Sequence, residues 1–218
     1  MRVILQFEKT GSAKYISHLD VLRAMQRALR RARVPVAYSQ GFNPHMQLSF
    51  ATALSLGQQS RAELLDMKLT RMVDLPQMLK DLNAAFPTGF YAPRARAADD
   101  GEPKLTKRMK WASYRIVTEQ PCGAQAAAFL QKERCVVEKR GKKGVREVDI
   151  RPMVRSLVWD ESDGALTAVL TCCDSIALSP ELLLAALEVQ GPAQVTRTGL
   201  YGQRDDELID LFDGGAVL

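Results

Sequence analysis

The same order of secondary-structure patterns occurs twice along this chain of 218 residues, on either side of a break at residues 97–110. Each copy begins with a strand, continues through a helix and further extended segments to a second helix, and ends in a strand. A βαββαβ order of this kind is typical of a sandwich with two helices on one face of an antiparallel sheet. We therefore predict an α+β protein of two tandem ferredoxin-like (βαββαβ) sandwiches with antiparallel sheets.

The first copy carries clear signals for where its helices start. Ser17 has Asp20 three residues later, a short-carboxylate version of the capping box, and this predicts a helix that runs to about Arg33. Asp74, with a proline two residues later, predicts the start of the second helix. The other elements predicted in this half are strands or extended segments at 2–8, 34–38, 46–54, 62–70 and 90–96, and the second helix ends at Phe86.

The second copy follows a stretch whose acidic residues, glycine and proline break any periodicity. Its predicted elements are a strand at 111–118, a helix at 123–132, a hairpin of 135–139 with 145–150, a strand at 165–172, a helix at 179–188 and a strand at 193–200. The predicted organisation is an N-terminal half at 1–98, a linker at 99–110, a C-terminal half at 111–201 and an acidic tail at 202–218.

Composition places the chain among ordinary globular proteins, with 46% apolar and 25% charged residues. None of the four cysteines forms a CxxC pair, so neither a zinc site nor a disulfide framework is indicated, and we expect reduced thiols and no metal in this chain. The amino-terminal residues lack the apolar run of a signal peptide, and no stretch approaches the roughly 18 apolar residues of a membrane span. We therefore expect a cytoplasmic protein with no membrane partner.

Basic charge is concentrated rather than spread over the chain. The first 50 residues hold eight Lys or Arg against two carboxylates, whereas the last 18 hold one arginine against five carboxylates. Basic clusters are the usual electrostatic footprint of nucleic-acid contact, although each cluster alone is equally compatible with a solvated surface. The predicted nucleic-acid patch comprises Arg23, Arg27, Arg30 and Arg31 of the first helix and Lys139, Arg140, Lys142 and Lys143 of the hairpin turn.

The only two histidines, His18 and His45, lie in polar segments of the first copy. If residues 34–38 form the second strand, the loop into the first helix and the loop after that strand meet at one end of the sheet. Gly41 and Asn43 can take positive φ and expose N–H groups, and a helix amino terminus adds partial positive charge, which suits an anion. The predicted substrate- or anion-binding residues are Ser17, His18, Tyr38, Ser39, Gln40, Gly41, Phe42, Asn43 and His45.

Each of these residues also has a purely structural interpretation. His18 can be a structural histidine, a ligand contact or a metal ligand, and Asp20 can be a helix-end carboxylate paired with Arg23 or a catalytic group. Glutamine and asparagine in the 39–45 loop can tie down a turn or recognise a ligand. Tyr38 and Phe42 can be packing residues or stacking platforms for a base.

Several segments together resemble the radical-SAM-associated proteins, a bacterial family of unknown function that carries the domain DUF2344. They are 7–11 (FEKTG), 16–20 (ISHLD), 27–32 (RALRRA) and 38–45 (YSQGFNPH), followed by 62–66 and 82–87 and, more weakly, 148–152 and 196–197. After the histidine of the loop, Met46 and Gln47 stand where many relatives have Pro-Lys, which weakens a phosphate contact there.

The resemblance implies a partner, because family members are encoded beside or fused to a radical SAM protein, often near genes for a ribonuclease and ribosomal proteins. This chain lacks the CxxxCxxC triplet that holds a radical SAM cluster, so the iron-sulfur cluster and S-adenosylmethionine are expected in the partner. We expect a noncatalytic companion that binds or presents the enzyme's substrate, RNA or a ribosome-linked molecule. One alternative is an RNA-processing or RNA-modifying enzyme with His18 and His45 as acid and base, or with Asp20 as a catalytic group, an idea that rests on fold analogy. Another is a protein-protein docking module that uses the acidic tail.

Overall fold

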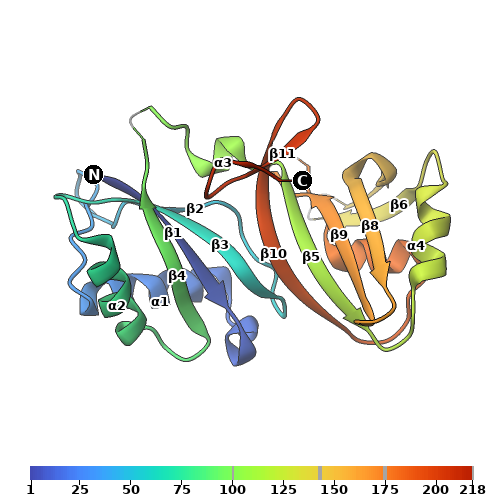
Figure 1. The fold of residues 1–218 in the computed structure, drawn as a ribbon, viewed down its shortest axis with the longest axis horizontal. Coiled ribbons are helices and arrows are strands. Elements are labelled where there is room, and N and C mark those ends of the chain that lie inside the picture. The colour runs from blue at the N-terminus through green and yellow to red at the C-terminus, as the bar shows by residue number, and fades with distance from the viewer. Residues whose placement is uncertain (100, 142–143, 174–175, 218) are drawn as a thin grey trace. The chain divides into compact units, whose positions relative to one another are not determined.

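The computed structural model describes residues 1–99, 101–141, 144–173 and 176–217 (Figure 1). The chain is an α+β protein, and its contacts divide it into two compact units. Met1–Met109 together with Leu200–Leu218 form the N-terminal unit, and Lys110–Gly199 form the C-terminal unit. Within the described residues, no helix is long and apolar enough to cross a membrane.

The N-terminal unit contains a four-stranded sheet with the order β4-β1-β3-β2, in which every neighbouring pair is antiparallel. Helices connect β1 to β2 and β3 to β4, so the element order is βαββαβ. The bounds are β1 Arg2–Lys9, the 3-10 helix η1 Gly11–Tyr15, α1 His18–Arg31, β2 Leu48–Phe50, β3 Gln59–Lys68, α2 Leu75–Ala85 and β4 Phe90–Ala97.

Both helices pack on one face of this sheet (Figure 1). Alternate residues of β1 point to that face, where Val3, Leu5 and Phe7 are buried with Met25 and Leu29 of α1. The helix starts follow the predicted signals. The side chain of Ser17 accepts a hydrogen bond from the N–H of Asp20, and that of Asp74 accepts one from the N–H of Gln77.

The stretches predicted as linker and acidic tail belong to the N-terminal unit. They form α3 (Leu105–Arg108), the last residues of β10, β11 (Glu207–Asp210) and β12 (Ala216–Val217). Arg94 of β4 pairs with Asp213 at 2.6 Å, and Arg96 donates to the Phe212 carbonyl and pairs with Glu102 at 2.7 Å. Through Phe212 and Asp213, the segment at 201–217 therefore contacts the sheet of this unit.

The C-terminal unit has the strand order β10-β5-β9-β8, and β6 and β7 form a separate two-stranded sheet. The bounds are β5 Trp111–Thr118, α4 Gly123–Leu130, β6 Val136–Gly141, β7 Gly144–Asp149, the 3-10 helix η2 Arg151–Met153, β8 Val154–Asp160, β9 Ala165–Thr171, α5 Pro180–Ala186 and β10 Ala193–Arg204. Ser179 caps α5, as predicted, by accepting from the N–H of Leu182.

Two strand predictions were wrong. Residues 34–38 form only isolated bridges, Val36 with Leu69 and Tyr38 with Met46, and the second strand of the sheet is β2 at 48–50. Strand β8 was missed because a bulge between Val154 and Ser156 interrupts the alternation that would have revealed it. Both errors arise from pairing, which local sequence patterns do not report.

Candidate functional site

The first candidate site lies at the start of α1, where Ser17, His18 and Asp20 come together. Ser17 Oγ donates to Asp20 Oδ2 at 2.7 Å, and Arg23 pairs with Asp20 Oδ1 at 3.0 Å. The Ser17 hydroxyl first and the Arg23 guanidinium second lower the pKa of Asp20. Asp20 is thus the helix-end carboxylate of the structural interpretation, held in its ionised form.

His18 is exposed and packs edge-on against the ring of Phe50, with 5.2 Å between the ring centroids. Beside it lies a cavity of only about 10 Å³, lined among others by Phe7, Lys9 and Glu63. Such a volume accepts about one water-sized probe and no substrate.

Lys9 and Glu63 are charged residues buried next to this cavity, and their burial was not expected. Their exposed fractions are 2% and 4%. The Lys9 amine donates to the carbonyls of Lys14 and Ile16 at 3.4 and 3.3 Å, which ties η1 to the segment that leads into α1. Both residues occupy inward positions of their strands, two residues from Phe7 and Leu65, so continuing the alternation along β1 and β3 would have found them.

The loop at 39–45 lies elsewhere. It follows α1 and precedes β2, and its exposed turn is closed by the Ser39 N–H donating to the His45 carbonyl at 2.9 Å. Ser39 Oγ and His45 Nδ1 lie 2.9 Å apart, and Gly41 has φ +133° as predicted, whereas Asn43 does not have positive φ. Gln40 and Asn43 are exposed in this turn.

The shared histidine notch that the sequence predicted does not form. His18 lies against Phe50, which pairs with Leu65, whereas Gln47, two residues after His45, accepts from the N–H of Lys68, three residues farther along β3. The reason is that the second strand of the sheet is β2 and not the segment at residues 34–38. Because β2 comes after the 39–45 loop, that loop sits where α1 ends rather than where it begins. The Gly89 carbonyl accepts a hydrogen bond from the Thr10 N–H at 2.8 Å.

Phe42 does not serve as a packing residue, whereas the side chain of Tyr38 is more than half covered. Phe42 is 108% exposed, more than in a reference tripeptide, and Tyr38 is 42% exposed. Large aromatic side chains in this position lose apolar burial unless a binding partner covers them. This exposure does not fit the packing interpretation for Phe42.

The basic face of α1 is present as predicted. Arg23, Arg27, Arg30 and Arg31 are all exposed, while the opposite face buries Val21, Ala24, Met25, Ala28 and Leu29. Arg31 donates to the Ala85 carbonyl of α2, and Arg23 pairs with Asp20.

The second predicted basic cluster lies in the β6–β7 hairpin. There Lys139 donates to the Ala177 carbonyl at 2.8 Å. The Arg140 side chain and residues Lys142 and Lys143 lie outside what the structure describes.

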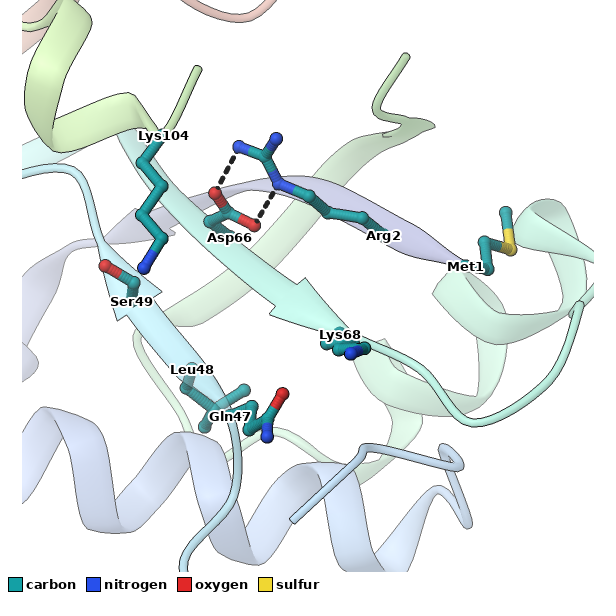
Figure 2. A pocket seen from close by; sticks show the side chains of 8 residues that line it. All are labelled: Met1, Arg2, Gln47, Leu48, Ser49, Asp66, Lys68 and Lys104. Atoms are coloured by element: carbon teal, nitrogen blue, oxygen red, sulfur yellow. Dashed lines mark hydrogen bonds and ion pairs between the residues drawn. The ribbon is translucent and has the colours of Figure 1, made fainter. Parts of the chain in front are cut away.

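A larger cavity lies in the N-terminal unit, where β1, β3 and the chain around β2 meet residue 104 (Figure 2). Its volume is about 670 Å³. Sequence reasoning did not identify it, because its lining comes from four segments that are distant along the chain. These residues are Met1, Arg2, Gln47, Leu48, Ser49, Asp66, Lys68 and Lys104.

Among the described residues, no group of three His, Cys, Asp or Glu side chains is arranged to hold a metal ion. The four cysteines are free thiols, and burial raises the pKa of Cys122.

The sequence model of the family described as an uncharacterized protein conserved in bacteria (DUF2344) matches residues 2–180. The chain therefore belongs to the DUF2344 family. No curated protein matches it.

Proposed function

We propose that this protein binds RNA through the exposed face of α1 and acts as a noncatalytic companion that presents substrate to a radical SAM iron-sulfur enzyme. The observation that carries the RNA-binding part is the row of exposed arginines, Arg23, Arg27 and Arg30. They stand at intervals of four and three residues, so their side chains follow one side of the helix over about 10 Å. Guanidinium groups on such a row can each bind a phosphate of one nucleic-acid strand.

The ion pair that Arg23 of this face makes with Asp20 can be replaced by a contact with phosphate. The Arg23–Asp20 pair has side-chain exposures of 64% and 51%. An exposed pair of this kind contributes about 0–1 kcal/mol, so a phosphate can replace Asp20 at little cost. The exposed Phe42 supplies a ring on which an unpaired base can stack in an RNA complex.

The fold proposal follows from the strand orders. Both units have a βαββαβ connection with the order fourth-first-third-second strand, and the C-terminal unit carries the β6–β7 hairpin between its first helix and its second strand. We propose that both are ferredoxin-like sandwiches. Within such a scaffold, rigid elements position α1 and the loops around it.

The two alternatives have less support. An RNA-processing enzyme that uses His18 and His45 as acid and base needs both groups within reach of one substrate bond, whereas His18 packs on Phe50 and His45 is held in the 39–45 turn beside Ser39. A docking module that uses the acidic tail needs its carboxylates exposed and available. Two of them are engaged within the N-terminal unit, because Asp213 pairs with Arg94 and Asp210 Oδ1 accepts from the N–H groups of residues 212 and 213.

The experiment compares RNA affinity over a range of salt concentrations by fluorescence anisotropy. In the double variant Arg27→Gln/Arg30→Gln the slope of log K against log salt should fall by about 1.4, because two phosphate contacts to single-stranded RNA are lost. Arg23 and Arg31 are left unchanged, since they contact Asp20 and Ala85. The matched control is Arg61→Gln/Arg71→Gln, which removes the same charge from exposed positions of the same unit.

Loss of RNA affinity only in the α1 variant supports the proposal. Equal loss in both variants would mean that RNA is attracted by net charge and not bound by α1.

The companion role is tested separately. The radical SAM protein encoded nearby should copurify with the tagged chain from its native host. If that protein is expressed in the same cells but does not copurify, the companion role is refuted.

A further inference from the structure

We infer that the cavity lined by Lys68 and Lys104 is a binding site for a nucleoside phosphate. The inference does not rest on the RNA proposal, because the cavity and the arginine face of α1 share no residue. Its volume of about 670 Å³ lies within the range of roughly 300–1,000 Å³ found for small-molecule sites.

The charge of the lining selects an anion. Three cationic side chains, Arg2, Lys68 and Lys104, face one carboxylate, Asp66. Arg2 holds that carboxylate with two parallel hydrogen bonds of 2.8 and 2.6 Å, as Figure 2 shows. Because this pair neutralises Asp66, the two lysines leave a net charge of two positive units on the lining. A phosphate monoester carries about −1.5 to −2 at neutral pH and matches that charge.

The position of Lys104 is fixed by a network around the preceding residues. Arg2 donates to the backbone carbonyls of Glu102 and Pro103, and Glu102 is held in turn by Arg96 and Arg108. Leu105, the next residue, is 1% exposed. The chain on both sides of Lys104 is therefore anchored, and the lysine reaches toward Ser49 in Figure 2. A lysine whose backbone is anchored in this way loses less backbone entropy when it binds an anion than a lysine in a flexible segment does.

The remaining lining suits the nucleoside part of the ligand. Met1 and Leu48 give apolar surface on which a base can lie, and Ser49 offers a hydroxyl group. Gln47 is oriented by a hydrogen bond from its amide nitrogen to the Tyr38 carbonyl at 3.2 Å. The carboxylate of Asp66 keeps acceptor capacity beyond its two bonds to Arg2 and can accept a ribose hydroxyl. Inorganic phosphate would use the lysines alone and leave these contacts unmade.

A nucleoside phosphate can come from two sources, a free nucleotide or the 5′-phosphorylated end of an RNA strand. Calorimetric titration of the full chain with adenosine 5′-monophosphate, adenosine and inorganic phosphate tests the chemistry. A pair of hexaribonucleotides that differ only in a 5′-phosphate or 5′-hydroxyl then tests the source. Tighter binding of the phosphorylated hexamer than of the free nucleotide identifies an RNA end, and the reverse order identifies a free nucleotide.

The variants are Lys68→Ala and Lys104→Ala, with Lys107→Ala as the matched control, an exposed lysine three residues from Lys104 that does not line the cavity. We expect each cavity variant to weaken adenosine 5′-monophosphate about tenfold or more, as loss of a charged hydrogen bond does, and the control to leave it unchanged. Adenosine should bind at least tenfold more weakly than its phosphate. Circular dichroism of each variant verifies that the fold is retained.

Equal affinity of the Lys68→Ala/Lys104→Ala double variant and the unmodified protein would overturn the inference, as would equal binding of adenosine and its phosphate, or no nucleotide binding at millimolar concentration. The Arg27→Gln/Arg30→Gln protein separates the two proposals. If it retains nucleotide affinity while no RNA binding through α1 is found in any variant, the cavity stands and the RNA proposal fails.

Discussion

Replacing Glu102 by glutamine should destabilise the N-terminal unit in a way that depends on pH. Glu102 is 12% exposed in its side chain, makes hydrogen bonds of 2.7 and 2.8 Å to Arg96 and also pairs with Arg108. Arg96 first, with Arg108 adding a further attraction, lowers the pKa of this carboxyl from 4.5 to about 2. The glutamine amide has no charge to offer either arginine.

The size of the effect follows from linkage between protonation and folding. A shift from 4.5 to about 2 corresponds to an upper limit of about 3.4 kcal/mol at neutral pH. Solvent screening reduces this limit, since the pairs lie near the surface, and we expect about 1–2 kcal/mol. The folded-state pKa is lowered, so the stabilisation is complete above the unfolded value and is lost as pH falls toward 2. By pH 3.5 roughly 40% of it should be gone.

Urea denaturation followed by circular dichroism at pH 7 and pH 3.5 measures this difference. The matched control is Glu207→Gln, an exposed carboxylate in the same unit. Hydrogen exchange of residues 99–109 should increase in Glu102→Gln, because the glutamate anchors that segment. The reasoning is refuted if the variant is as stable as the unmodified protein at pH 7, or if its deficit is the same at both pH values.

Three further substitutions are expected to separate stability from binding. Gly89→Ala should destabilise the unit by about 2 kcal/mol or more in urea denaturation, because its φ is +88° and a Cβ there would lie 2.6 Å from the Thr10 carbonyl and 2.8 Å from Ala13 Cβ. A smaller loss of unfolding free energy in Gly89→Ala would mean that the chain at Thr10 shifts easily to make room for the Cβ. Ser17→Ala should cost about 1 kcal/mol of unfolding free energy through loss of the helix cap, and threonine should restore most of it. Phe42→Ala should change the melting temperature little but lower affinity for single-stranded RNA, and unchanged RNA affinity would remove Phe42 from the proposed interface.

Much of the architecture was predictable because its signals are local. The caps at Ser17, Asp74 and Ser179 each accept from an N–H three residues later, so a short sequence window contains the whole interaction. Strand choice is different. Residues 34–38 and 48–50 both read as extended, and only pairing with β3, distant in sequence, decides which one joins the sheet.

The same distinction explains which site residues could be predicted. Helical periodicity alone places Arg27 and Arg30 on an exposed face, and the structure confirms it. The histidine pair failed because its proximity depended on the wrong second strand. The cavity lined by Lys68 and Lys104 gave no local signal, since it exists only after Arg2 joins β1 to the chain at residues 102–103.

Cross-linking to RNA tests the central claim most directly. The chain is irradiated with bound RNA in its native host, digested, and the nucleotide-bearing peptides are identified by mass spectrometry. The account predicts cross-links on peptides from α1 and from the 39–45 loop, with Phe42 among the modified residues and with loss of the α1 signal in Arg27→Gln/Arg30→Gln. Cross-links confined to the β6–β7 hairpin, or recovery of no RNA from a folded and expressed protein, would contradict it.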